Sequence, residues 1–200
     1  MRVTNKMLVD NLSNNLSSNL EKLNMFQDRL STGKRINKPS DDPIGMKNIL
    51  QQRTNLGETD QYSTNVDSAQ LWLQENETAV SSAETIIVRI KELATAGANG
   101  TLNSGDRKVM AAEVDDLFKE LIRIGNSNIN GEYIFSGQMT HTPSYDTNGN
   151  YKGDTETISR QIGNNTYLEI NLSGEEVFNA NGIDAFQTVK NLKTALEDND

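Results

Sequence analysis

The sequence has 200 residues, of which 34% are hydrophobic and 6% aromatic, and its mean hydropathy is −0.63. So little apolar material suits a thin, elongated helical body better than a thick globular core. The formal net charge of −9 disfavours nucleic acid as a partner, because its phosphate groups would be repelled. Cysteine is absent and histidine occurs once, which excludes disulfides, thiol catalysis and a zinc cluster of nitrogen and sulfur ligands.

The first 32 residues carry a narrow apolar stripe in a polar background. Leucines recur mostly every three or four residues, which predicts a helix over residues 7–30. The other positions are crowded with asparagine and serine, which form helices poorly because their side chains compete for backbone hydrogen bonds. We expect residues 1–32 to be a terminal coiled-coil helix, disordered in the monomer and ordered when other helices cover it. An ordinary amphipathic helix on the core of its own domain stays open as the alternative. The stripe consists of Leu8, Leu12, Leu16, Leu20, Leu23 and Leu30.

Turn-forming residues then predict a linker over residues 33–43, which begins with Gly33. Asp42 followed by Pro43 is a helix-start signal, because the carboxylate can cap free amides and proline fits the first turn. Asp41 and Asp42 could also be paired carboxylates for acid–base chemistry. Adjacent acidic residues before a proline are more often helix caps, and we interpret them so.

Two further helices are predicted to form an antiparallel hairpin. The first carries a coiled-coil stripe and ends near residues 97–100, and the second runs from Ser104 to Gly125, capped by Ser104 or Asp106. The first stripe contains Val66, Ala69, Leu73, Asn76, Val80, Ala83, Ile87, Ile90 and Ala94, and the second Met110, Val114, Leu117, Leu121 and Ile124. We expect the two helices to pack through Leu73, Val80, Ile87, Ile90, Val114, Leu117 and Leu121.

After residue 124 the pattern changes to period two with Asn-Gly turns, which predicts a small antiparallel β region. A strand is expected over residues 133–137. The buried face of the β region would be formed by Ile158, Ile162, Leu168, Ile170 and Leu172. A last helical stripe begins around Asp184 and contains Ile183, Phe186, Val189, Leu192 and Leu196. The expected fold is therefore mainly α with a small β insert: a long antiparallel helical rod over 44–130, a β domain over 131–182 and the start of a returning helix over 183–200.

The residues offer no convincing chemical site. Asp146, Asn148, Asn150 and Asp154 resemble a calcium loop only loosely, because the glycine and the final carboxylate are misplaced, and a hairpin turn is the better interpretation. His141 has no nucleophile or carboxylate partner nearby in the sequence. We predict no catalytic residue, cofactor or metal. Neither an apolar signal-peptide core nor a membrane span is evident, so we expect no membrane partner and no cleaved signal peptide.

Residues 30–46, LSTGKRINKPSDDPIGM, resemble the flagellin-family signature that joins the terminal coiled-coil segment to the rod domain. Its motif positions here are Arg35, Asn37, Asp41, Asp42 and Pro43. Residues 88–94 and 98–101 look like the flagellin rod helix and its following turn. Residues 128–137, NINGEYIFSG, are more similar to the hook-associated branch of the family than to filament flagellin.

This resemblance implies a secreted structural subunit that joins the flagellar hook to the filament and has no enzyme activity. It implies export in a largely unfolded state by the flagellar type III apparatus and polymerisation through the leucine stripe. The implied partners are further copies of the chain, a neighbouring hook-associated protein, flagellin and an export chaperone. Family members end in helices that return to the N-terminal ones, so the chain is expected to be truncated, and the chaperone would bind the missing part.

Two other functions stay open: filament flagellin itself, and a non-flagellar helical interaction module. Arg89 lies where the resemblance places an arginine that flagellin presents to an innate immune receptor. An exposed arginine on a rod helix is more often an ordinary solvated side chain, and we interpret Arg89 that way.

Overall fold

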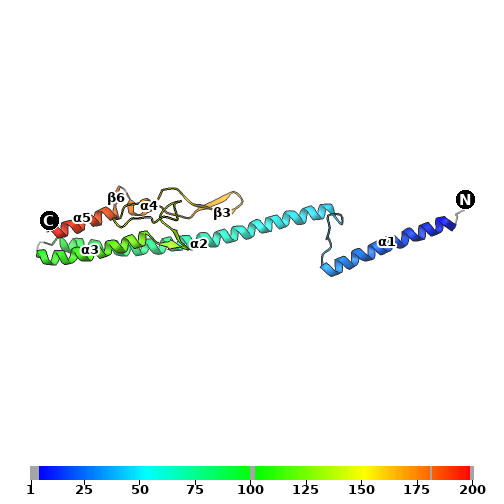
Figure 1. The fold of residues 1–200 in the computed structure, drawn as a ribbon, viewed down its shortest axis with the longest axis horizontal. Helices are drawn as coiled ribbons and strands as arrows, with labels where there is room; N and C mark the ends of the chain where they lie inside the picture. Colours follow the sequence, from blue (N-terminus) through cyan, green and yellow to red (C-terminus); the bar gives the residue numbers. More distant parts are fainter. Residues whose placement is uncertain (1–4, 100–101, 181, 199–200) are drawn as a thin grey trace. The chain divides into compact units, whose positions relative to one another are not determined.

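The computed structural model describes residues 5–99, 102–180 and 182–198, and the chain divides into two compact units, Met1–Thr59 and Asp60–Asp200. Helix α2 (Pro43–Gly97) begins in the first unit and ends in the second. Figure 1 shows the order of the elements along the chain. Among the described residues, no helix is both long and apolar enough to cross a membrane.

The first unit contains helix α1 (Asn5–Thr32), the linker after it and the first turns of α2. Helix α1 ends at glycine, because Gly33 takes a φ of +67°, a left-handed conformation that favours glycine at a helix end. Of the described side chains in this unit, Ile36 is the only buried hydrophobic one. The unit therefore has almost no core of its own.

Helix α2 has a buried stripe that steps by three and four residues through the second unit: Ala69, Trp72, Asn76, Ala79, Ala83, Ile86, Ile90, Leu93 and Gly97. This stripe shares only part of the predicted one. Leu73 and Ile87 were expected in the packing surface, but each is 41% exposed, and Val80 is half-buried. Both stripes satisfy the same helical spacing, because they share the row Ala69, Asn76, Ala83 and Ile90. Apolar residues flank this row on both sides of the helix, and one flanking row repeats every seventh residue from Val66. Only the covering elements decide which row is buried.

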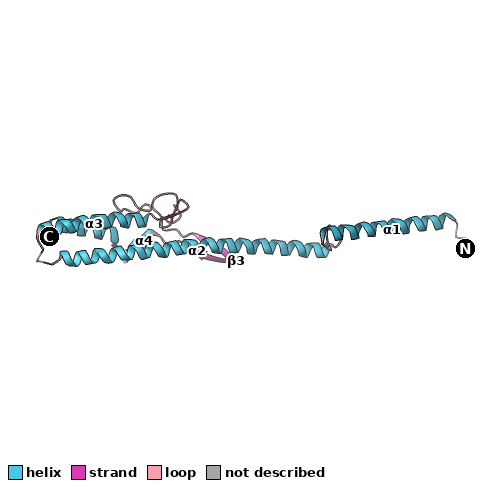
Figure 2. Ribbon diagram, turned by 90° about the horizontal axis from the view of Figure 1, so that it is seen from below, coloured by secondary structure: helices cyan, strands magenta, loops and turns pink. Residues whose placement is uncertain are grey.

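Helix α3 (Ser104–Gly125) runs back along α2, as the views in Figures 1 and 2 agree. Its cap is Asn103, whose side chain accepts the amide of Asp106 at 2.9 Å, so the predicted caps Ser104 and Asp106 were wrong. Asn103 caps because it still has an extended backbone, whereas Ser104 is already helical. Val114 and Leu121 are fully buried, and Leu117 packs half-buried against the core.

Helix α5 (Ala185–Asp198) packs against α3, which makes a third helix of the second unit. Phe186, Val189 and Leu196 are its buried residues, whereas Ile183 of the predicted stripe is 65% exposed and lies in a strand. Lys193 of α5 pairs with Asp115 of α3 at 2.7 Å. The predicted final helix is thus present, and it packs against α3 and, through Leu196, against Gly97 at the end of α2.

The β structure consists of three two-stranded antiparallel sheets. They are β1 (Asn128–Ile129) with β2 (Glu132–Tyr133), β3 (Ser159–Gly163) with β4 (Thr166–Glu169), and β5 (Asn179–Ala180) with β6 (Ile183–Asp184). Asn130 and Gly131 both take positive φ at the first turn, as a two-residue hairpin with a primed turn requires. The expected strand over 133–137 stops at Tyr133, because the following residues turn inward and bury Ile134 and Phe135 completely.

An aromatic cluster joins the β region to the helices of the second unit. The ring of Tyr145 lies 4.3 Å from that of Phe186 and 5.6 Å from that of Phe178, measured between centroids. Phe178 belongs to the short helix α4 (Gly174–Phe178), which a capping box between Ser173 and Glu176 starts. Gly125 has to be glycine here, since a Cβ would come within 2.7 Å of the Tyr145 ring. Burial raises the pKa of the Tyr145 hydroxyl well above its ordinary value.

Two asparagines of α2 attach the β3–β4 region to the helix. The Asn65 amide donates to the carbonyl of Gln161 at 2.7 Å, and the Asn76 amide donates to the carbonyl of Ile170 at 3.0 Å. Asn76 is 3% exposed and Ile170 is 1% exposed, so this second bond is shielded from water. The polar residue in the predicted coiled-coil stripe therefore holds a strand end in place.

Replacing Asn76 by alanine should lower the free energy of unfolding of the second unit by about 1–3 kcal/mol, because the Ile170 carbonyl would stay buried without its donor. Denaturant unfolding followed by the fluorescence of Trp72, the one tryptophan of the sequence, measures this. Glu84→Ala, at an exposed position of the same helix, is the control and should change stability little. Equal midpoints for the two variants would contradict the role given to Asn76.

Candidate assembly surface and linker

Helix α1 presents an apolar surface to solvent along its length. None of its described side chains is buried, and only Met25 and Arg29 are half-buried. The six leucines predicted as a polymerisation interface are exposed as follows: Leu8 57%, Leu12 70%, Leu16 61%, Leu20 54%, Leu23 54% and Leu30 84%. An exposed apolar row of this length is uncommon on a soluble monomer, which makes it the candidate interaction surface of the first unit. Below, this row is called the leucine stripe.

Sequence reasoning left out apolar residues that widen the leucine stripe. Phe26 is 56% exposed and fills the gap between Leu23 and Leu30, while Val9 is 64% exposed near the start of the helix. The signal was available in the helical spacing, because Phe26 lies three residues after Leu23 and four before Leu30. The apolar row is therefore continuous to the last turn of α1.

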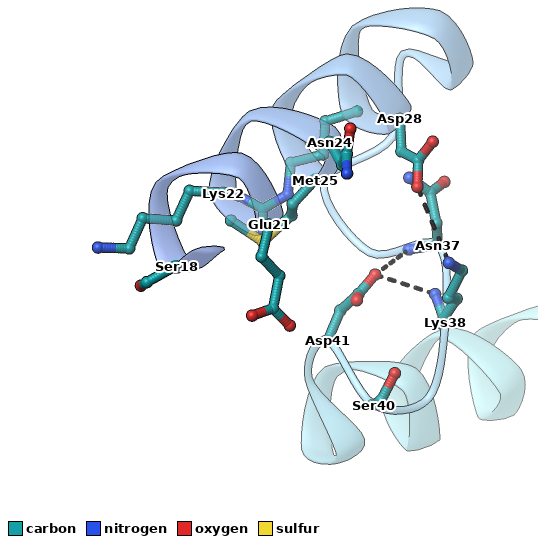
Figure 3. A pocket seen from close by; sticks show the side chains of 11 residues that line it. Ser18, Glu21, Lys22, Asn24, Met25, Asp28, Asn37, Lys38, Ser40 and Asp41 are labelled. Atoms are coloured by element: carbon teal, nitrogen blue, oxygen red, sulfur yellow. Dashed lines mark hydrogen bonds and ion pairs between the residues drawn. The ribbon is translucent and has the colours of Figure 1, made fainter. Parts of the chain in front are cut away.

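Beyond α1, the first linker carboxylate organises a tight turn. Asp41 accepts the backbone amides of Asn37 and Lys38, both at 3.0 Å, as the dashed lines of Figure 3 show. These two amides, that of Asn37 first, hold the pKa of Asp41 below its ordinary value of 3.8. A third bond closes the turn, since the Asp41 amide donates to the carbonyl of Lys38 at 3.0 Å. Asp41 is thus a structural acceptor.

The second linker carboxylate caps helix α2. Asp42 accepts the amide of Gly45 at 2.8 Å and pairs with the guanidinium of Arg35 at 3.2 Å. The Gly45 amide is the main cause that lowers the pKa of Asp42, and Arg35 lowers it further. Pro43 is the first residue of the helix, where a missing amide hydrogen has no cost. The interpretation as a helix cap therefore agrees with the hydrogen bonds of Asp42. For Asp41 it was wrong, because this carboxylate accepts the amides of Asn37 and Lys38 in the turn before the helix.

Ile36 and Gly45, which sequence reasoning did not single out, complete this arrangement. Ile36 is 8% exposed, and a Cβ on Gly45 would lie 2.5 Å from its terminal methyl and 2.5 Å from an Asp42 oxygen. Glycine is disfavoured within a helix, so its presence in the first turn of α2 was the signal available. The side chain of Ile36 occupies the space that a larger residue at Gly45 would need.

A polar groove of about 390 Å³ separates the last turns of α1 from the linker (Figure 3). Its charged side chains balance, three acidic against three basic: Glu21, Asp28 and Asp41 against Lys22, Arg29 and Lys38. Lys38 and Asp28 form an ion pair across it at 3.8 Å, with both side chains more than half exposed. Exposed pairs of this kind contribute little to stability.

In the second unit an apolar groove of about 560 Å³ opens between α2, α5 and the α4–β6 segment. Ile87, Ala94, Val177, Val189 and Leu192 are among its lining residues. Ile87 is therefore exposed because it lies on the wall of this groove, outside the contact between α2 and α3.

Arg89 is engaged within the second unit. Its guanidinium lies 2.7 Å from a carboxylate oxygen of Glu113 on α3 and 3.0 Å from one of Glu92, and its side chain is half-exposed. This agrees with a solvated residue of the rod surface. It also makes Arg89 one of the links between α2 and α3.

The acidic turn interpreted as a hairpin is held by its own carboxylate. Asp146 accepts the amides of Asn148 and Asn150, each at 2.9 Å, and Tyr145 bridges to Tyr151 across the turn. Hydrogen bonds from the side chain and the backbone of Asn150 lower the pKa of Asp146 to about 2. Among the described residues no group of three potential metal ligands occurs.

The geometry thus defines a class of protein: a helical subunit whose terminal helix exposes an apolar row, joined by a capped linker to a helix bundle with small β sheets. The model of the bacterial flagellin N-terminal helical region matches residues 3–140. The chain therefore belongs to the bacterial flagellin family.

Individual relatives fall in two groups. Flagellar hook-associated protein 3 of Escherichia coli is 28% identical and that of Salmonella typhimurium 26% identical, each match covering 90% of this chain and 57% of the relative. The flagellar filament 41 kDa core protein of Borreliella burgdorferi is 34% identical, with 58% of this chain and 34% of the relative covered. The chain thus spans little more than half of the hook-associated relatives.

Two solved structures of FlgL proteins are similar to the chain. FlgL from Xanthomonas campestris has a TM-score of 0.59 and 28% identity, over 63% of this chain and 42% of that protein. FlgL from Bacillus cereus has a TM-score of 0.63 over 78% of this chain and 75% of that protein, but at 17% identity it shows the fold alone.

The order of the linker should depend on pH in the acid range. Because Asp41 and Asp42 have lowered pKa values, their contribution is fully present above the ordinary value of 3.8 and is lost as the pH falls through the lower folded-state pKa. NMR chemical shifts of the amides of Asn37, Lys38 and Gly45 should report this change.

Asp41→Asn provides the matched control for this titration. It should abolish the acid-range change at the amides of Asn37 and Lys38 and retain it at Gly45, whose acceptor is Asp42. A Gly45 amide that loses its titration together with the other two would contradict the separate roles of the two carboxylates.

Proposed function

We propose that this chain is a structural subunit of the bacterial flagellum that joins the hook to the filament and polymerises through helix α1. The observation that carries the proposal is the exposed leucine stripe on a helix that precedes the flagellin-type linker. Similarity to hook-associated protein 3 over 90% of the chain supports the junction rather than another flagellar position.

The composition of α1 suits export followed by assembly. Its asparagines and serines make the isolated helix weak, so the segment passes readily through a narrow channel. Once other subunits surround it, burial contributes roughly 1.5–3 kcal/mol per leucine. We propose export through the flagellar type III apparatus without a cleaved signal peptide, and a final location outside the cell at the hook–filament junction.

The proposed partners follow from this position. They are other copies of the chain in a ring or helical assembly, a neighbouring hook-associated protein, flagellin and, before export, a chaperone that binds a C-terminal region. The linker with Arg35, Asn37, Asp41, Asp42 and Pro43 would transmit force between the inner layer formed by α1 and the outer layer formed by the second unit.

We propose no catalytic role. The paired carboxylates Asp41 and Asp42 are engaged by backbone amides, and Asp146 closes a turn. His141 is exposed and lies in a loop. None of these groups is arranged with a partner as acid–base or nucleophilic catalysis requires.

Filament flagellin is the second candidate, because two filament proteins match 58% of the chain at slightly higher identity than the hook-associated relatives. The hook-associated relatives align over 90% of the chain, whereas two filament proteins align over 58% of it and one flagellin over 85%. Complementation of flagellar mutants that lack either the junction protein or flagellin, with the full-length gene, separates the two functions. Rescue of the flagellin mutant alone would refute the junction role.

Replacing Leu16 and Leu20 together by asparagine should abolish assembly, because the burial of two leucines would no longer help to offset the conformational entropy that α1 loses on ordering. Electron microscopy of junctions in cells that express the full-length variant measures it. Asn14→Ser with Ser18→Asn, which exchanges polar residues on the opposite face, is the control and should assemble normally. Normal junctions in the leucine variant would show that this stripe is not the assembly surface.

Backbone amides of residues 7–30 should exchange rapidly with solvent in a dilute monomer and slowly in the assembled state, because the helix lacks tertiary packing until neighbours cover it. Hydrogen–deuterium exchange followed by mass spectrometry gives this comparison. Amides near Leu121, in the buried part of α3, serve as an internal reference and should be protected in both states. Strong protection of residues 7–30 in the monomer would contradict coupled folding and assembly.

A further inference from the structure

Gly33 separates a segment with buried contacts from a helix that has none among its described residues. After Gly33, residues 34–42 are bonded to one another and to the start of α2 through two carboxylates and one buried side chain. Before Gly33, helix α1 has no buried described residue. This asymmetry bears on where the chain bends between its terminal helix and α2.

The linker is attached to α2 by several contacts. Asp42 caps the helix through the amide of Gly45 at 2.8 Å and binds Arg35 at 3.2 Å. Ile36 is 8% exposed and closes against the Gly45 backbone, where a Cβ would have no room. The Asp41 turn ties Asn37 to the residue immediately before Asp42. Asp42 and Ile36 both lie against Gly45, so these contacts share the first turn of α2.

The links that cross Gly33 are few and solvent-exposed. The Lys34 amide donates to the Thr32 hydroxyl at 3.3 Å, and Lys38 pairs with Asp28 at 3.8 Å. The groove of about 390 Å³ lies between the last turns of α1 and the linker, so side chains do not fill this space (Figure 3). Exposed ion pairs and single exposed hydrogen bonds contribute little to stability.

Gly33 itself has the freedom that a pivot needs. Its φ is +67°, and a Cβ built on it would meet nothing within 4 Å. Glycine populates positive and negative φ with similar ease, so a rotation here meets no steric barrier at Gly33 itself. Of the α1 side chains that line the groove facing the linker, only Met25 and Arg29 are half-buried. A glycine at a helix end explains the positive φ by itself. It does not explain why a buried side chain, Ile36, lies after Gly33 while none of the described side chains of α1 is buried.

We propose that residues 34–42 form a rigid cap on the first turns of α2, and that helix α1 changes its direction by rotation about Gly33. Of the linker predicted over residues 33–43, the part after Gly33 is then a fixed extension of α2, and Gly33 is the joint at its beginning. This proposal concerns the mechanics of the single chain and does not depend on the function proposed above.

The absence of cysteine allows a direct test, because two introduced cysteines are the only sites for spin labels. One pair, Ser40→Cys with Gln52→Cys, measures the distance from the cap to α2. A second pair, Ser31→Cys with Gln52→Cys, measures the distance across Gly33. All three positions are exposed. Pulsed EPR on the full chain should give a narrow distance distribution for 40–52 and a broad one for 31–52.

Three glycine substitutions then locate the joint. Gly33→Ala should shift and narrow the 31–52 distribution while 40–52 stays the same, because alanine rarely adopts the positive φ. Gly45→Ala should broaden 40–52, since its Cβ would displace Ile36 and Asp42. Gly57→Ala is the matched control: it lies in α2, outside both labelled intervals, in open space, and should change neither.

The proposal fails on either of two results. A 40–52 distribution as broad as that of 31–52 would show that the linker is flexible throughout. An unchanged 31–52 distribution in Gly33→Ala would place the joint elsewhere. Unaltered Trp72 fluorescence in each variant confirms that the second unit is folded, and because no assembly is measured, failure here leaves the junction role untouched.

Discussion

The exposed apolar row of α1 is the constraint on which the remaining architecture depends. A helix of weak intrinsic propensity that exposes six leucines gains stability only when another surface covers them. The first unit cannot supply that surface, because Ile36 is its only buried hydrophobic side chain among those described. Within the described residues of the first unit, no other segment buries the leucines of α1.

The second unit, by contrast, contains a continuous core. Helices α2, α3 and α5 share buried stripes, and the aromatic cluster around Tyr145 and Phe186 joins them to the β region. Buried Asn76 bonds to the Ile170 carbonyl, so one polar contact specifies where the β3–β4 region lies on α2. The second unit therefore has a core of its own, which the described residues of the first unit lack.

The linker that follows α1 is held against the start of α2 by local contacts. Its carboxylates, its buried Ile36 and the missing side chain of Gly45 all act on the start of α2. If the subunit stands at a junction, as proposed, one joint at Gly33 would let α1 adapt to neighbours while the orientation of the cap on α2 is retained. That property would suit a molecule in contact with two different assemblies.

Several features were predictable because they rest on local chemistry. These features are the leucine spacing of α1, the Asp-Pro start of α2 with its cap Asp42, the glycine-rich end of α2 and the Asn-Gly hairpin. Each involves residues only a few positions apart. Helix and turn formation follow such patterns directly. The linker motif also indicates the flagellin family, because its characteristic residues are contiguous in the chain.

Other features could not be predicted, because they depend on which segment covers a surface. Leu73 and Ile87 fit the helical period as well as Trp72, Ile86 and Leu93, yet only the latter three are buried. The strand expected beyond Tyr133 ended early because Ile134 and Phe135 turn into the core. Helix α4 has five residues, too few for a periodic signal.

By itself, the sequence determined the long helices, the linker chemistry and the apolar row of α1, since these follow from neighbouring residues and their spacing. Only the tertiary structure decided which apolar row of α2 is buried, how Asn76 is used and that Ile36 fits over Gly45. Burial and cavity shape arise from segments far apart in the chain, and periodicity carries no information about which of two apolar faces another segment will cover.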